Sequence, residues 1–184
     1  RPLRIVQWTT GKVATQSVKA ILERQELELV GLYAFSKEKV GQDVGDLINL
    51  GRKVGIKATD DIDALLALRP DCIVYMPLHP NVDEMARLLR AGVNVVTTAS
   101  FITGRGYGEP ARRQLEDAAQ AGGVSLFGSG INPGWVDALV ATATMVGITS
   151  GPPAIRICQR LVVRIAVATA GAASTASCAQ ANEG

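Results

Sequence analysis

The sequence has little histidine or cysteine, no long apolar run, and charges that nearly cancel. One histidine, His79, and three cysteines among 184 residues are too few for a histidine-rich zinc site or a disulfide scaffold. Nineteen Lys and Arg against seventeen Asp and Glu give a net charge of +2, too even for electrostatic nucleic-acid binding. Arg164 interrupts the best apolar stretch, which therefore falls short of the roughly 20 residues of a membrane helix.

What remains is the composition of a globular protein. Hydrophobic residues make up 47% of the chain and charged residues 20%, which excludes disordered and fibrous classes. No basic-then-apolar segment opens the sequence. We therefore expect a reduced, cytoplasmic protein whose partners are small molecules, with neither a membrane nor a nucleic acid among them.

The composition changes near residue 150. Residues 150–184 hold three of the nineteen basic residues, one of the seventeen acids and nine alanines, so residues 1–149 carry sixteen of each charge. The breaker sequence Gly151-Pro152-Pro153 stands at the change. We predict a domain over residues 1–149 and a low-complexity tail over 150–184, read as a truncated or frame-altered remnant of a second domain.

Within residues 1–149, short apolar segments alternate with segments of helical periodicity. The predicted strands cover residues 3–8, 27–34, 54–58, 72–75, 94–98 and 124–128. The predicted helices cover residues 11–24, 60–66, 81–91, 109–121 and 135–145, with Asn81 as an N-cap and Gly92 as a C-terminal stop.

Several of these strands are continuous apolar runs, typical of strands buried on both faces of a parallel sheet. With right-handed crossovers, the alternation predicts an α/β fold with a doubly wound parallel sheet. Ligands bind such a sheet at the carboxyl ends of its strands.

The first predicted strand and helix are joined by QWTTGKVA, residues 7–14. A dinucleotide-binding turn places glycines where Thr9, Gly11 and Ala14 stand, so Gly11 and the small Ala14 fit and Thr9 departs from the pattern. The free N–H groups of residues 11–14 and the hydroxyls of Thr9 and Thr10 would face an anion placed there. A strand–helix turn that binds nothing is the alternative.

The second strand ends without an acid, since the chain continues Phe35-Ser36-Lys37-Glu38. An acid at this position binds the ribose 2′-hydroxyl of NAD, whereas Ser36 and Lys37 suit the 2′-phosphate of NADP. The sequence therefore favours NADP as the cofactor. NAD remains the alternative, because the acid Glu38 lies close to this position.

Five segments in order carry a resemblance to a known family: QWTTGKVA, ELVGLYAFSKEKVGQDVGDL, DCIVYMPLHP, GVNVVTTASFITG and FGSGINPG. Residues 4–148 resemble the NAD(P)-binding half of the dihydrodipicolinate reductase-like family, in the branch related to 2,4-diaminopentanoate dehydrogenase and native amine dehydrogenases. The resemblance implies a two-domain oxidoreductase with a Rossmann fold, whose second domain supplies the substrate pocket and a contact for homo-oligomers.

The resemblance also implies cofactor contacts at five places. They are Thr10, Gly11, Lys12 and Val13 at the phosphate turn; Ser36 and Lys37 at the adenosine ribose; Met76, Pro77 and Leu78 after the fourth strand; Thr98, Ala99 and Ser100 near the nicotinamide; and Asn132, Pro133 and Gly134 near the carboxamide.

Two departures from the family concern catalysis. The His-His and Lys motif of the reductases has no counterpart here, and Ser100 follows the fifth strand where amine-forming relatives carry a glutamate. A hydroxyl is a poor acid–base group near neutral pH, so catalytic residues stay unassigned, with Ser100 and His79 as weak candidates. A surface role in its loop is the alternative for His79.

The sequence thus predicts an NAD(P)H-dependent oxidoreductase that reduces a C=O or C=N bond of a small metabolite, incomplete as it stands. A non-catalytic dinucleotide-binding or sensor module is the alternative.

Overall fold

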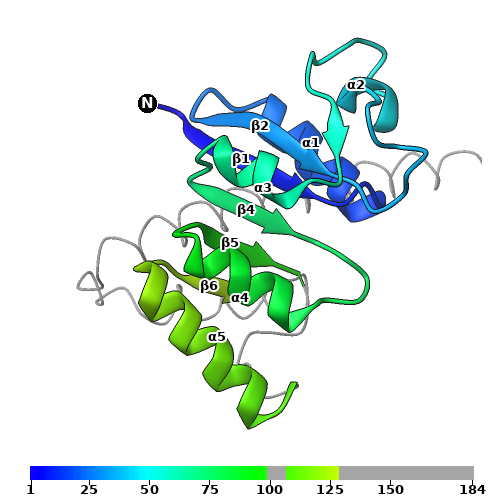
Figure 1. Cartoon of the computed structure of the whole chain (residues 1–184). Coiled ribbons are helices and arrows are strands. Elements are labelled where there is room, and N and C mark those ends of the chain that lie inside the picture. The colour runs from blue at the N-terminus through cyan, green and yellow to red at the C-terminus, as the bar shows by residue number, and fades with distance from the viewer. Residues whose placement is uncertain (99–106, 129–184) are drawn as a thin grey trace, which may run out of the picture.

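A computed structural model describes residues 1–98 and 107–128, which form a six-stranded parallel sheet flanked by helices (Figure 1). The strand order is β3-β2-β1-β4-β5-β6, which confirms the doubly wound α/β fold. The strands are β1 Leu3–Trp8, β2 Leu27–Tyr33, β3 Ala58–Thr59, β4 Cys72–Tyr75, β5 Asn94–Thr97 and β6 Leu126–Gly128. The helices are α1 Lys12–Leu22, α2 Val44–Leu47, α3 Ile62–Ala67, α4 Val82–Arg90 and α5 Glu109–Gly122. The helix expected over 135–145 and the boundary near 150 lie outside the described residues.

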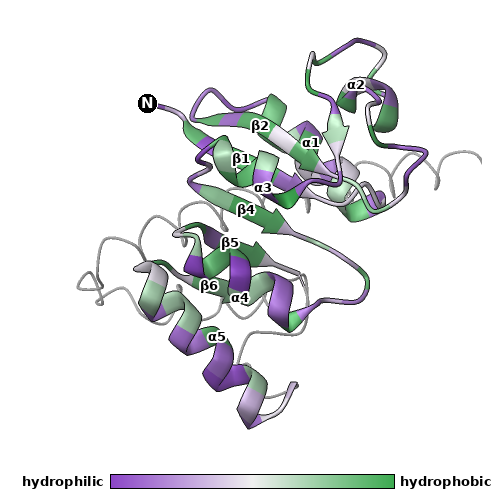
Figure 2. Ribbon diagram, viewed as in Figure 1, coloured by the Kyte–Doolittle hydropathy of each residue, from purple (hydrophilic) through white to green (hydrophobic). Residues whose placement is uncertain are grey.

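Two hydrophobic cores sandwich the sheet. Residues of α1 and α2, such as Val18 and Val44, pack on one face. Residues of α3, α4 and α5, such as Leu65, Leu88 and Leu115, pack on the other. Figure 2 shows the hydrophobic strands between helices whose outer faces are hydrophilic, most clearly along α5. Each helix therefore buries one apolar stripe against a sheet that is covered on both faces.

The central strands are buried along most of their length because the hydrophobic cores on the two faces of the sheet both pack against them. All four residues of β4 are buried, and β1 is buried from Ile5 to Trp8.

Within the described ranges, no helix has both the length and the apolar character to cross a bilayer.

The segment between β2 and α3 differs from the prediction. The third strand was expected over residues 54–58, but β3 begins only at Ala58, and the short helix α2 was not predicted. Hydrogen bonds from Val44 N to Ile56 O and from Ala58 N to Gln42 O fold this segment back on itself. Its apolar residues pack on the α1 side of the sheet, so the sequence has the apolar pattern of a longer strand although the segment does not extend the sheet.

Asp43 holds this segment together. Its carboxylate accepts hydrogen bonds from the backbone N–H groups of Gly45 (2.7 Å), Val54 (2.9 Å) and Gly55 (2.8 Å). One side chain thereby caps α2 and joins it to residues eleven and twelve positions further along the chain. The bonds from Val54, Gly45 and Gly55 favour the ionised form and lower the pKa of Asp43.

We predict that Asp43→Asn lowers the urea midpoint at pH 7, because an amide cannot accept all three bonds. Since the pKa of Asp43 is lower in the folded state, its contribution is complete above the unfolded pKa of about 4 and is lost as the pH falls through the folded pKa. The urea midpoints of wild type and Asp43→Asn should therefore converge at acid pH. The control is Asp63→Asn, which removes the negative charge of an exposed ion-pair partner of Arg87 and should cost little stability. Parallel pH profiles for wild type and Asp43→Asn would contradict the assignment.

Candidate functional site

A cleft of about 800 Å³ opens at the carboxyl ends of β1, β2, β4 and β5. It lies where the sheet order reverses, because β1 pairs with β2 on one side and with β4 on the other. The connections that leave β1 and β4 form its opposing walls. This is the position where doubly wound sheets bind their ligands.

The structure brings most of the predicted site residues together in this cleft. Those that line it are Thr9, Thr10, Gly11, Lys12, Val13, Ser36, Met76, Pro77, Leu78, His79 and Thr98. Lys37 does not line it, and Ala99, Ser100, Asn132, Pro133 and Gly134 lie outside the described residues.

Four further lining residues were not singled out from the sequence: Phe35, Lys39, Pro80 and Tyr107. Phe35 and Lys39 flank the predicted pair Ser36 and Lys37, so their proximity to the second strand was the available signal. Tyr107 precedes α5, and nothing in its sequence context pointed to the cleft.

The N-terminus of α1 faces the cleft without a side-chain cap. Gly11 is the N-cap residue, no side chain accepts a hydrogen bond there, and the first turn holds no acid. The first N–H groups of a helix lack intrahelical acceptors, so those of this turn are available to an anion. A Cβ built on Gly11 would meet no atom within 4 Å, which leaves space for close approach.

Thr9 adopts a backbone conformation that normally favours glycine. Its φ of 79° is unusual for a β-branched residue, and it explains why glycine is the usual residue at this point of such turns. Two hydrogen bonds hold it: Thr9 N donates to Tyr33 O (3.0 Å) and its hydroxyl donates to Met76 O (3.1 Å). The hydroxyl thus ties the first turn to the loop after β4.

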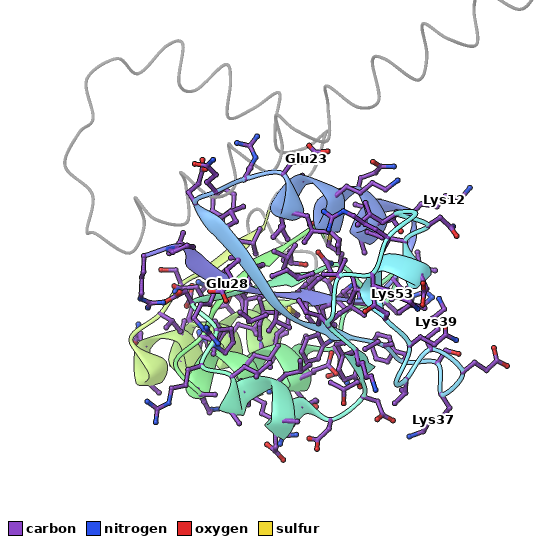
Figure 3. All side chains as sticks on the ribbon, turned by 90° about the horizontal axis from the view of Figure 1, so that it is seen from above. Lys12, Glu23, Glu28, Lys37, Lys39 and Lys53 are labelled. Atoms are coloured by element: carbon purple, nitrogen blue, oxygen red, sulfur yellow. The ribbon has the colours of Figure 1, made fainter. Side chains whose placement is uncertain are left out.

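Two lysines bring positive charge to the cleft. The Lys39 ammonium donates to the Thr10 hydroxyl at 2.7 Å, and Lys12 opens α1. Figure 3 shows both near the side toward which the strands point, with Glu23 and Glu28 farther from it. Among the described lining residues there is no carboxylate. The cleft is therefore suited to an anion.

Lys37 is engaged elsewhere. Its ammonium pairs with Asp60, which follows β3, and 86% of its side chain is exposed. The hydrogen bond between them raises the pKa of Lys37 and lowers that of Asp60. Because β3 lies next to β2 in the sheet, an acid remote in sequence reaches the lysine that the resemblance assigned to the ribose.

The cleft also exposes apolar surface. Val13 and Phe35 are each 55% exposed and Leu78 is 88% exposed, and all three line it. Such exposure beside cations fits a ligand that combines anionic groups with flat apolar ones. For proton transfer the described lining offers His79 and Tyr107, and burial raises the pKa of the Tyr107 phenol. The geometry thus favours binding over acid–base chemistry.

The strand order, the uncapped α1 and the anion-suited cleft define a Rossmann-type domain. Residues 5–125 match the family model described as dihydrodipicolinate reductase, N-terminus. The chain belongs to this family of NAD(P)-binding oxidoreductase domains, as its motifs indicated.

Individual relatives agree with this assignment. An amine dehydrogenase from Streptomyces virginiae is 36% identical over 137 residues, which cover 71% of this chain and 38% of that protein. A 4-hydroxy-tetrahydrodipicolinate reductase from Synechococcus elongatus is 31% identical over 98 residues, covering 50% of this chain and 36% of that protein. The solved structure of amine dehydrogenase from Mycobacterium smegmatis has a TM-score of 0.63 at 29% identity, covering 71% of this chain and 40% of that one. The chain thus spans about two fifths of the length of these relatives.

We predict that Thr9→Gly is more stable than Thr9→Ala by about 1 kcal/mol, because both lose the hydroxyl and only glycine is free of strain at this φ. Thr10 supplies the control, since its φ is not positive and Thr10→Gly should be less stable than Thr10→Ala. Thermal unfolding of the four variants measures both orders. The same order at both positions would show that the turn is not strained at Thr9.

Proposed function

We propose that this chain is the cofactor domain of an NAD(P)H-dependent oxidoreductase. One observation carries the proposal: the uncapped N-terminus of α1 opens into a cleft with two lysines and, among its described lining, no carboxylate. The diphosphate of the dinucleotide would lie over Gly11, where a Cβ is missing and open space adjoins the helix N–H groups.

Lys39 and Ser36 are suited to the 2′-phosphate of NADP. Both line the cleft, and the Lys39 ammonium contacts a hydroxyl, which leaves its charge uncompensated by that contact. Lys37 is paired with Asp60 and exposed, so Lys39 is the better placed of the two lysines. An ammonium attracts a doubly charged phosphate more than a ribose hydroxyl, which favours NADP over NAD.

The whole protein would reduce a C=O or C=N bond of a small metabolite. The bound dinucleotide supplies the hydride, and the chain's own residues bind and orient it. The names of the relatives, amine dehydrogenase and 4-hydroxy-tetrahydrodipicolinate reductase, support this reaction class. The substrate pocket and any homo-oligomer contact would come from the remainder of a longer protein, as the resemblance implies.

Gly11→Ala tests the diphosphate position. The substitution places a methyl group in the open space over the helix N–H groups and should raise the Kd for NADPH at least about tenfold, because close approach to the amides is lost. The φ of Gly11 is −71°, which alanine adopts, so the unfolding midpoint should change little. Isothermal titration and thermal unfolding measure the two effects.

Gly122→Ala is the matched control. Its Cβ would lie 1.9 Å from the backbone oxygen of Leu89, at the opposite end of the sheet, so stability should fall while affinity below the melting temperature stays unchanged. Wild-type binding by Gly11→Ala would contradict the proposed diphosphate position. If wild type binds neither NADPH nor NADH, the proposed function is wrong.

Lys39→Ala and Lys37→Ala test the basis of NADP preference. Lys39→Ala should raise the Kd for NADPH about tenfold and that for NADH much less, since a charge-assisted contact to the 2′-phosphate is lost. Lys37→Ala, the same change two residues away, should alter either Kd less than about twofold. A larger effect at Lys37 would instead support the assignment made from the sequence.

A further inference from the structure

The loop between β4 and α4 forms one wall of the cleft along its whole length. It comprises residues 76–80, and all five line the cleft. Its first residue is held by the hydrogen bond from the Thr9 hydroxyl to Met76 O. Its other end meets α4 at Asn81, the N-cap residue.

That end is closed by an unusual variant of a helix capping box. Asn81 Oδ1 accepts from Glu84 N (3.1 Å), as an N-cap side chain does with the third helical residue. In an ordinary box the third residue's carboxylate would accept from the N-cap N–H. Here Asn81 N donates instead to the Tyr75 hydroxyl (3.1 Å), which donates to Glu84 Oε1 (2.5 Å).

The inserted phenol joins the two ends of the loop. Tyr75 is the last residue of β4 and fully buried, so its ring has one fixed position under the loop. Burial raises its pKa, which keeps the hydroxyl protonated and able to donate. The indole N–H of the buried Trp8 also donates to Glu84 Oε1 (3.2 Å), which fixes the carboxylate against β1.

We infer that Tyr75 and Glu84 are positioning residues for the cleft: with Asn81 they form a capping triad that sets the conformation of residues 76–80 and thereby the affinity for the dinucleotide. The inference rests on the proposed function for the identity of the ligand. None of the three lines the cleft, so the triad acts through the loop alone.

Tyr75→Phe is the decisive variant in the full chain, because it keeps the ring and removes the hydroxyl that joins the loop ends. The Asn81 amide should exchange with solvent about tenfold faster, and the Kd for NADPH should rise about five- to tenfold, as expected for one lost hydrogen bond. Hydrogen exchange by NMR, without ligand, and isothermal titration measure the two effects.

Two further variants separate positioning from general destabilisation. Tyr33→Phe makes the same change on β2, on the other side of β1 from β4. There the ring stacks on Trp8 at 4.1 Å and the hydroxyl is not part of the triad, so exchange and affinity should stay at wild-type values. Glu84→Gln keeps an oxygen that can accept from both Tyr75 and Trp8 and should stay within about twofold of wild type, whereas Glu84→Ala should behave like Tyr75→Phe or worse.

Unchanged exchange at Asn81 or unchanged affinity in folded Tyr75→Phe would overturn the inference. An equal loss in Tyr33→Phe would do the same, because the effect would then follow from aromatic packing. If wild type binds neither NADPH nor NADH, the proposed function fails by itself. The triad is then judged on Asn81 exchange alone, which needs no ligand, and wild-type exchange in Tyr75→Phe rejects it.

Discussion

The pairing of β1 with both β2 and β4 is the constraint on which the candidate site depends. Register places Trp8 beside Tyr33 on one side and beside Tyr75 on the other, so the three strands end level. The chain must then leave β1 and β4 in adjacent connections, and a crevice opens between them. The cleft therefore follows from topology, and the side chains around it determine only what it accepts.

Polar bonds then fix the two walls relative to each other. Thr9 bonds to the carbonyl of Met76 across the strand ends, and Glu84 accepts from Trp8 of β1 and Tyr75 of β4. Both contacts link β1 to the β4 side, one at the mouth of the cleft and one beneath its wall. Buried donors without partners are costly, so these groups specify one arrangement of the loops more than they add net stability.

Local patterns predicted most of the strands and helices, the turn between β1 and α1, and the Asn81 cap, because each depends on residues close in sequence. The engagement of Lys37 could not be predicted, since Asp60 reaches it only through the pairing of β2 with β3. The part of Tyr75 in the cap was hidden for the same reason. Its hydroxyl accepts from Asn81 N, whereas the capping-box pattern in the sequence would give that hydrogen bond to the Glu84 carboxylate. Only the tertiary fold brings the Tyr75 side chain to this position.

The distribution of carboxylates completes the account of selectivity. Asp60 pairs with Lys37, and Asp43 accepts from backbone N–H groups, and neither carboxylate lines the cleft. Glu84 is directed at Trp8 and Tyr75 behind the loop. Charges act most strongly where solvent screening is weak. For anion binding, the absence of carboxylates from the described lining therefore matters as much as the presence of Lys39. An anion that enters meets ammonium and amide donors, while the carboxylates of Asp43, Asp60 and Glu84 are bound to partners outside the lining.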